Sequence, residues 1–174
     1  MKKIAMFIAF KGFRDEEYFV PKEIIEAAGH KITTFSTKIG TAAGKLGGKA
    51  QTDCIISEIN YKDYDAITLV GGPGALPELD NAAVHEIFRN AAAEGKLIGA
   101  ICISPMILAH AGLLKGRRAT VWTDAEQGNI PDFKDCGAIY KGAAVEHDGK
   151  IITANGPAAA KSYAEEILKA LEQK

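Results

Sequence analysis

The sequence has few cysteines and no excess of charge of either sign. Its 174 residues include only Cys54, Cys102 and Cys136, and an odd, sparse set of this kind argues against a disulfide framework and for a reducing, cytoplasmic compartment. Lysine and arginine together number 21, and aspartate and glutamate 22, which gives a net charge of −1. Without a basic excess there is no electrostatic reason to expect a nucleic acid or an anionic membrane as partner.

Long apolar runs are scarce as well. The run Ile4–Phe10 is short for a signal peptide and is followed at once by charged residues, so a first strand is expected there. The segment Leu97–Leu114 carries no charged residue of the Asp, Glu, Lys or Arg type and is nearly long enough to cross a bilayer. Ser104, Pro105 and His110 interrupt it and its first half has strand character, so we expect buried core and no membrane span.

The spacings typical of metal and nucleotide sites are also missing. The cysteines and the four histidines form no known ligand pattern, so neither a metal nor a cofactor is expected; the histidines are His30, His85, His110 and His147. Residues 40–46 resemble a phosphate-binding loop, but one residue is missing between the glycines, and Leu46 stands where serine or threonine is required. Nucleotide binding is therefore not expected.

What remains is the composition of one globular domain over residues 1–174, with 47% hydrophobic and 25% charged residues. Strands are expected at Ile4–Phe10, Lys31–Ser36, Ala66–Val70, Leu97–Ile101 and Ala119–Trp122, with a hairpin turn at His147–Lys150. Apolar residues at helical spacing mark Val20–Ala28, Val84–Ala91 and Ala160–Leu171. This alternation predicts an α/β fold with a mostly parallel sheet and helices on both faces.

Ligands of such sheets bind outside the carboxyl ends of the strands, near a switch in strand order. That rule selects three loops, one after each of the first, third and fourth major strands: Lys11–Glu17, Gly71–Gly74 and Cys102–Ser104. The site is therefore expected where these three loops meet.

The third of these loops has the pattern of a nucleophile elbow. In the run AICISP, small residues flank Cys102 at a strand-to-helix turn, which lets the backbone turn sharply and expose the central side chain. The amino end of the following helix would then favour the thiolate and lower the pKa of the thiol. The alternative is that Cys102 is a small buried hydrophobe, as free cysteines often are.

The other two loops offer the groups that a thiolate nucleophile needs. The N–H of Ile103 and the N–H of Gly72 are candidate donors for a developing oxyanion. Asp15, Glu16 and Glu17 lie in the first loop, and a carboxyl held beside a thiolate would have a raised pKa and act as a general acid or base. The pattern alone does not select one of the three acids, which can equally complement the helix dipole.

Four segments together resemble the ThiJ/PfpI superfamily, which includes protein deglycases. They are AICISP, GGPGA after a strand, DEEYFVP near the start and TANGPAAA before the last helix, and they span nearly the whole chain in the family's order. The resemblance implies a flavodoxin-like three-layer α/β/α sandwich of the class I glutamine amidotransferase-like type, and commonly a homodimer.

By position, the resemblance also assigns roles to residues. Cys102 matches the reactive cysteine, Glu17 the protonated glutamate that contacts it, and Gly72 and Ile103 the backbone donors around the sulfur. A further segment matches one that lies near the pocket: Asn155, Gly156 and Pro157.

The departures from the family pattern concern the catalytic base. Peptidase-like members carry histidine directly after the cysteine, where this chain has Ile103, and deglycase-like members often carry one in the next strand, at or beside Trp122. Ser104 replaces the usual glycine or alanine, and Trp122 becomes a candidate for lining the pocket. Two family sources of a base are thus missing.

Three functions follow as hypotheses. The first is a cofactor-independent cysteine enzyme of the glyoxalase III or deglycase type, acting on reactive dicarbonyls or early glycation adducts. The second is a cysteine peptidase or amidase of the PfpI type, which would need a base from a partner subunit, conceivably Glu78. The third is a redox-responsive stress protein that senses oxidants through Cys102.

Overall fold

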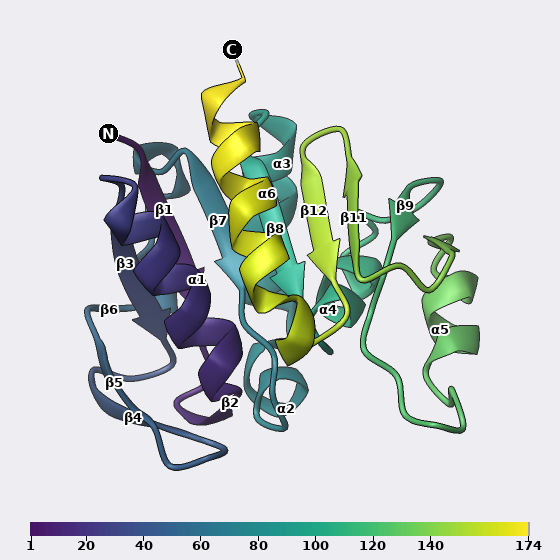
Figure 1. Cartoon of the computed structure of the whole chain (residues 1–174), viewed down its shortest axis with the longest axis horizontal. Coiled ribbons are helices and arrows are strands. Elements are labelled where there is room, and N and C mark those ends of the chain that lie inside the picture. The colour runs from purple at the N-terminus through teal and green to yellow at the C-terminus, as the bar shows by residue number, and fades with distance from the viewer. Residues whose placement is uncertain (174) are drawn as a thin grey trace.

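The chain folds around a seven-stranded sheet, and the computed structural model describes it over residues 1–173 (Figure 1). The strands in spatial order are β11 (Val145–Asp148), β12 (Ile151–Ala154), β8 (Leu97–Ile101), β7 (Ala66–Leu69), β1 (Lys3–Phe7), β3 (Lys31–Ser36) and β6 (Cys54–Ile55). Neighbouring strands are parallel except β11 and β12, which form an antiparallel hairpin. The inner order β3-β1-β7-β8-β12 is the 2-1-3-4-5 order of flavodoxin-like sheets, so the predicted α/β architecture is confirmed.

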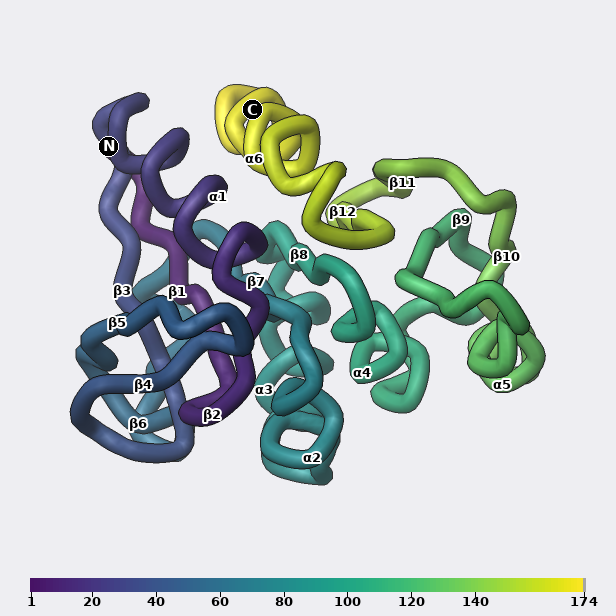
Figure 2. Tube along the Cα trace, turned by 60° about the horizontal axis from the view of Figure 1, so that its bottom comes forward, coloured from purple at the N-terminus to yellow at the C-terminus, as the bar shows by residue number. Residues whose placement is uncertain are grey.

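Helices cover both faces of this sheet (Figure 2). One face carries α1 (Asp15–Ala27) and α6 (Ala160–Glu172), and the opposite face carries α2 (Ala75–Leu79), α3 (Ala82–Ala93) and α4 (Pro105–His110). Because both faces are covered, the strands β7 and β8 are buried along their whole length and consist mainly of apolar residues, as their unbroken hydrophobic runs predict.

Smaller elements extend the sandwich at its two ends. A three-stranded sheet lies near the carboxyl end of β1 and contains β2 (Lys11–Phe13), β4 (Gly40–Gly44) and β5 (Lys49–Thr52). Beyond β11 lie β9 (Arg118–Ala119), α5 (Ile130–Asp135) and β10 (Ile139–Tyr140), with β9 and β10 paired in parallel. Short 3₁₀ turns occur at Ile56–Glu58, Tyr61–Asp63 and Pro157–Ala159.

Three expected strands end earlier than their apolar runs, and one of them, Ala66–Val70, does so by a single residue, at Leu69. The first strand stops at Phe7, although the next residues stay buried and Ile8 still donates its N–H to the Phe35 carbonyl at 2.9 Å. The strand expected at Ala119–Trp122 was wrong beyond Ala119. There the Trp122 N–H is taken by the Cys102 carbonyl at 2.7 Å, so the backbone turns toward the elbow and leaves the strand ladder.

The segment Leu97–Leu114 is core, as expected. It forms β8, the turn at Cys102 and helix α4, and every residue of β8 is buried. Within residues 1–173, no helix combines the length and the apolar character that a membrane crossing needs.

The strand order determines where the site lies. Strand β1 has β3 on one side and β7 on the other, so the chain leaves it in opposite directions on its two sides. The crevice of such a sheet opens at this switch point, at the carboxyl ends of the strands. The ends of β1, β7 and β8 therefore bring together the three loops that the sequence selects.

The aromatic core beneath these strands gives a first testable prediction. Phe88 is fully buried and its ring lies edge-on to Phe7 with the centroids 5.4 Å apart. We expect Phe88→Ala to lower the free energy of unfolding by about 3–5 kcal/mol, because it leaves a cavity in the core. Denaturant titration measures this, with Phe19→Ala as the control because Phe19 is 38% exposed. Equal losses in the two variants would contradict the assigned core.

Candidate active site

Cys102 occupies a strained turn between β8 and α4. Its φ is 65°, a left-handed conformation that is uncommon for residues other than glycine and that surrounding contacts must hold in place. Two backbone hydrogen bonds do so: the Cys102 N–H donates to Ala154 at 2.8 Å, and its carbonyl accepts from Trp122. The side chain is only 8% exposed. The turn thus has the geometry of a nucleophile elbow.

A buried serine and a glycine next to this turn hold it in place and leave room for the Glu17 carboxyl. Ser104 is fully buried and donates its hydroxyl to the Val70 carbonyl at 2.8 Å, which ties the elbow to the end of β7. A Cβ on Gly71 would stand 2.5 Å from both the Cys102 Cβ and the Glu17 Oε2. Only glycine at position 71 therefore lets the cysteine and the carboxyl approach each other this closely.

The three acids at the start of α1 have three different surroundings. Asp15 accepts the N–H groups of Leu46 and Gly48 at 2.8 and 2.6 Å, and so fixes the turn between β4 and β5. Glu16 is paired with Arg14 at 2.7 Å. Glu17 is the acid that is fully buried and faces the elbow, which the sequence pattern alone does not reveal.

The Glu17 carboxyl has one bonded and one unpartnered oxygen. Oε2 accepts the N–H of Gly71 at 3.1 Å, whereas Oε1 is buried and has no hydrogen-bond partner among residues 1–173. Burial raises the pKa of Glu17 to about 7, although its interactions with the Cys102 sulfur and the Gly71 N–H counteract part of the rise. At neutral pH this carboxyl is therefore poised to exchange a proton.

The thiol does not behave as the helix-dipole argument predicts. Burial, together with the nearby negative charge of Glu17, raises the pKa of Cys102 to about 12. The backbone N–H groups of Gly72 and Ile103 interact with the sulfur and lower the pKa of Cys102, but by less than burial and Glu17 raise it. The expectation of a thiol pKa lowered overall is thus wrong, because it left out desolvation and the adjacent acid.

The two groups are best treated as one acid. Between pH of about 7 and about 12 the pair holds a single proton and a single negative charge. Moving that proton from sulfur to the unpartnered Oε1 converts thiol and carboxylate into thiolate and carboxylic acid. This thiolate–acid form is the nucleophilic one, and the raised pKa of Cys102 makes it the minor form of the pair at neutral pH.

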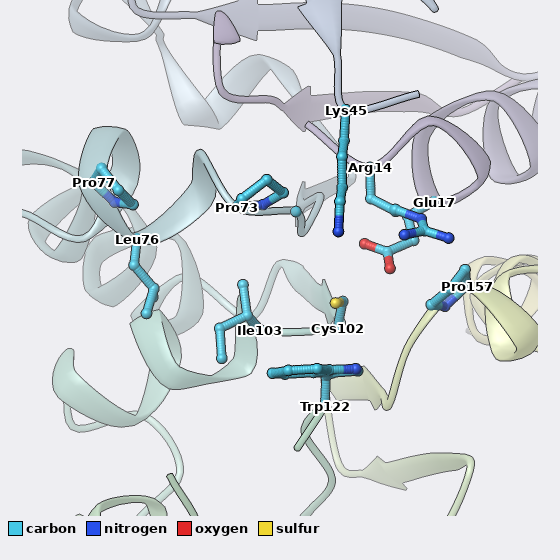
Figure 3. A pocket seen from close by; sticks show the side chains of 11 residues that line it. Arg14, Glu17, Lys45, Pro73, Leu76, Pro77, Cys102, Ile103, Trp122 and Pro157 are labelled. Carbon is cyan, nitrogen blue, oxygen red and sulfur yellow. The ribbon is translucent and has the colours of Figure 1, made fainter. Parts of the chain in front are cut away.

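The pair faces a pocket of about 700 Å³, within the range typical of small-molecule sites (Figure 3). Most of its wall is apolar and includes Pro73, Leu76, Pro77, Ile103, Trp122 and Pro157. The structure thus brings Trp122 and Pro157 to the pocket with the pair, but Asn155 and Gly156 do not line it. Gly156 lies next to the Trp122 ring, where a Cβ added to the glycine would stand 3.5 Å from that ring.

Sequence reasoning missed two cations in this pocket. Arg14 and Lys45 both line it and reach toward Glu17 and Cys102 in Figure 3. Asp15 accepts the N–H groups of Leu46 and Gly48, and these hydrogen bonds help to hold the turn that carries Lys45 beside the pocket. The incomplete phosphate-binding pattern of residues 40–46 was the one sequence signal that pointed to Lys45. The folded structure is needed to show that this lysine lies beside Cys102.

Alternative bases lie elsewhere. None of the four histidines is among the residues that line the pocket. Glu78 accepts the N–H groups of Phe10 and Lys11 at 2.7 and 3.1 Å and the hydroxyl of Thr37 at 3.1 Å, so its carboxylate is engaged in holding the turn after β1. Among residues 1–173, potential metal ligands cluster at a separate place, described below.

The sheet order and the strained cysteine turn define a flavodoxin-like α/β protein with an elbow cysteine. A sequence model of the DJ-1/PfpI family matches residues 2–170. An uncharacterized protein of Methanocaldococcus jannaschii is 41% identical over 172 residues, which are 98% of this chain and 83% of that protein. The chain belongs to the DJ-1/PfpI family, as its resemblance to ThiJ/PfpI proteins predicts.

Two further relatives extend this finding. A deglycase of Pyrococcus horikoshii is 29% identical over 167 residues, covering 96% of this chain and 98% of the deglycase. The crystal structure of a ThiJ/PfpI domain protein from Brachyspira murdochii matches with a TM-score of 0.92 at 31% identity, covering 97% of this chain and 95% of that one.

The raised pKa of Glu17 predicts a pH dependence of stability. Between pH 4.5 and about 7 the folded chain binds a proton that the unfolded chain has lost, so the free energy of unfolding falls as pH rises through this window. The rise from 4.5 to about 7 corresponds to a loss of about 3 kcal/mol. Glu17→Gln should lack this decline. Denaturant titration of both proteins from pH 4 to pH 8 measures it, and parallel curves would contradict the assignment.

Proposed function

We propose that the chain is a cofactor-independent cysteine enzyme that converts reactive dicarbonyls, or their early adducts on amines and thiols, into hydroxy acids. The observation that carries this proposal is the buried Glu17–Cys102 pair, which holds one proton beside the N–H groups of Gly72 and Ile103. The kinship with a protein named a deglycase supports the same reaction class.

In the first step, the Cys102 thiolate forms a carbon–sulfur bond with the aldehyde carbon of methylglyoxal. The N–H groups of Gly72 and Ile103, which already interact with the sulfur, can donate to the developing oxyanion. Glu17, in its acid form, gives its proton to that oxygen. The products of the step are a neutral hemithioacetal and a Glu17 carboxylate.

In the second step, the Glu17 carboxylate takes the proton from the former aldehyde carbon and returns it to the neighbouring ketone carbon by way of an enediol, while the hydroxyl proton of the hemithioacetal passes to the former ketone oxygen. The aldehyde carbon is oxidised and the ketone carbon reduced within one molecule, so no external electron acceptor is needed. Water then hydrolyses the resulting thioester, which releases lactate and restores the thiol. A carboxyl with a pKa of about 7 suits both proton transfers at neutral pH.

The pocket favours this reaction over peptide cleavage. A leaving amine needs a proton donor of its own, and Ile103 stands where peptidase-like members carry histidine. The pocket volume leaves room for an adduct larger than a three-carbon dicarbonyl, and Arg14 and Lys45 favour substrates with a negative group. The homodimer, the cytoplasmic location and redox sensing through Cys102 stay predictions.

Lactate production from methylglyoxal tests the proposal. We expect Cys102→Ser to lower the rate to the background of buffer, and Glu17→Gln to lower it by about 10²–10⁴-fold, the usual contribution of a general acid and base. Cys54→Ser is the matched control, because Cys54 is also a free thiol but lies in β6 away from the pocket. Equal rates in wild type and Cys102→Ser would refute the proposal.

A further inference from the structure

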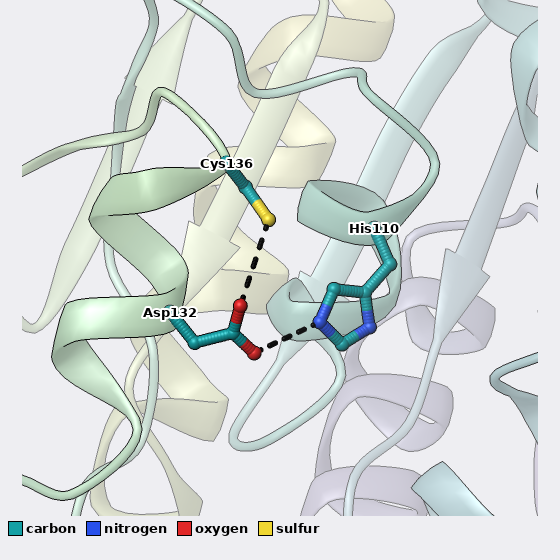
Figure 4. A group of neighbouring side chains, drawn as sticks. All are labelled: His110, Asp132 and Cys136. Atoms are coloured by element: carbon teal, nitrogen blue, oxygen red, sulfur yellow. Dashed lines mark hydrogen bonds and ion pairs between the residues drawn. The ribbon is translucent and has the colours of Figure 1, made fainter.

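A second group of reactive side chains lies outside the pocket, between α4 and α5 (Figure 4). His110 ends α4, Asp132 lies in α5, and Cys136 caps the carboxyl end of α5. One ligand atom from each lies within 4.8 Å of the other two. The Asp132 carboxylate already contacts both partners, at 3.1 Å from His110 Nε2 and 3.9 Å from Cys136 Sγ.

Asp80 supplies a second, independent feature of a metal site. His110 Nδ1 bonds to Asp80 Oδ2 at 2.7 Å, which leaves Nε2 as the nitrogen directed at Asp132. Asp80 is held in turn by His85 through its other oxygen at 2.6 Å. A carboxylate behind the far nitrogen is the usual arrangement of a metal-bound histidine, because it fixes the ring tautomer and orientation.

We propose that His110, Asp132 and Cys136 form a binding site for a zinc-class divalent cation. A thiolate, an imidazole and a carboxylate together suit Zn²⁺ better than Mg²⁺ or Ca²⁺, which prefer oxygen ligands alone. Ligand atoms around a tetrahedral Zn²⁺ lie roughly 3.3–3.8 Å apart, given bond lengths of about 2.0–2.3 Å. The present separations need only small side-chain rotations to reach this geometry.

The chemistry of binding is a simple exchange. The Cys136 thiol releases one proton to solvent when its sulfur binds the cation, and His110 binds through the Nε2 lone pair while Nδ1–H donates to Asp80. The His110 and Asp132 side chains are 29% and 59% exposed, so an ion can enter and water can complete the coordination. The site is separate from the Cys102 pocket, because none of its three ligands lines that pocket.

Cobalt substitution in the chelator-stripped full-length protein tests the site. We expect one Co²⁺ per chain, with the charge-transfer absorption of a thiolate ligand, and displacement of Co²⁺ by Zn²⁺. The band should disappear in Cys136→Ser and remain in Cys102→Ser and Cys54→Ser. A missing band in wild type, or one that survives Cys136→Ser, would overturn the proposal.

Zinc affinity, measured by competition with a chromophoric chelator, tests the role of Asp80. We expect Asp80→Asn to weaken Zn²⁺ binding by about 10–100-fold, the usual effect of removing such a supporting carboxylate. Asp135→Asn is the matched control, because it removes one carboxylate near Cys136 from a residue of α5 that is neither a proposed ligand nor a hydrogen-bond partner of His110 among residues 1–173. Thermal unfolding of each metal-free variant separates lost binding from lost folding. Equal affinities in a folded Asp80→Asn variant and wild type would contradict the proposed arrangement.

Discussion

The site depends on two buried groups that must share one proton. Glu17 is completely buried, and its Oε1 has no other partner, so the carboxyl and the Cys102 sulfur determine each other's charge. A lone buried carboxylate would be costly, and a lone buried thiolate equally so. One negative charge spread over the pair, with the N–H groups of Gly71, Gly72 and Ile103 around it, is the arrangement that this pocket stabilises.

The fold keeps these groups in place at the expense of local strain. Cys102 is held at a φ of 65° by the hydrogen bond that its N–H donates to Ala154 in β12 and by the one that its carbonyl accepts from the N–H of Trp122. Ser104 ties the same turn to the end of β7. Each of these contacts comes from a different strand end or loop. The chemistry therefore requires the sheet order that places β1, β7 and β8 side by side, because the ends of these strands assemble the site.

Much of this was accessible from the sequence, for identifiable reasons. Buried parallel strands leave unbroken apolar runs, so Leu97–Ile101 was predicted to the residue. Lys31–Ser36, which is rich in β-branched residues, was predicted to the residue as well. The small residues that flank Cys102 predicted the sharp turn at that position. In contrast, nothing local distinguishes Glu17 from Asp15, because their difference arises from which loop packs against each carboxyl.

The misses have one physical origin, which is that they depend on distances across the fold. The raised pKa of Cys102 results from burial and from Glu17, neither of which appears in a helix-dipole argument. Lys45 reaches the pocket because hydrogen bonds to Asp15 and Phe13 hold its turn against the start of α1, and His110 meets Cys136 because the fold brings the end of α4 close to the end of α5. Motif spacing detects functional residues that lie within one segment of the chain. It does not detect side chains from distant segments that meet only in the folded structure.

The rate of Cys102 alkylation by iodoacetamide as a function of pH tests the central claim most directly. A pair that shares one proton predicts a rise in the rate through pH of about 7 and a second rise only toward about 12. In Glu17→Gln the first rise should vanish, and the remaining titration should move below 12, because the negative neighbour is gone. A single ordinary thiol titration near pH 9 in both proteins would contradict the account.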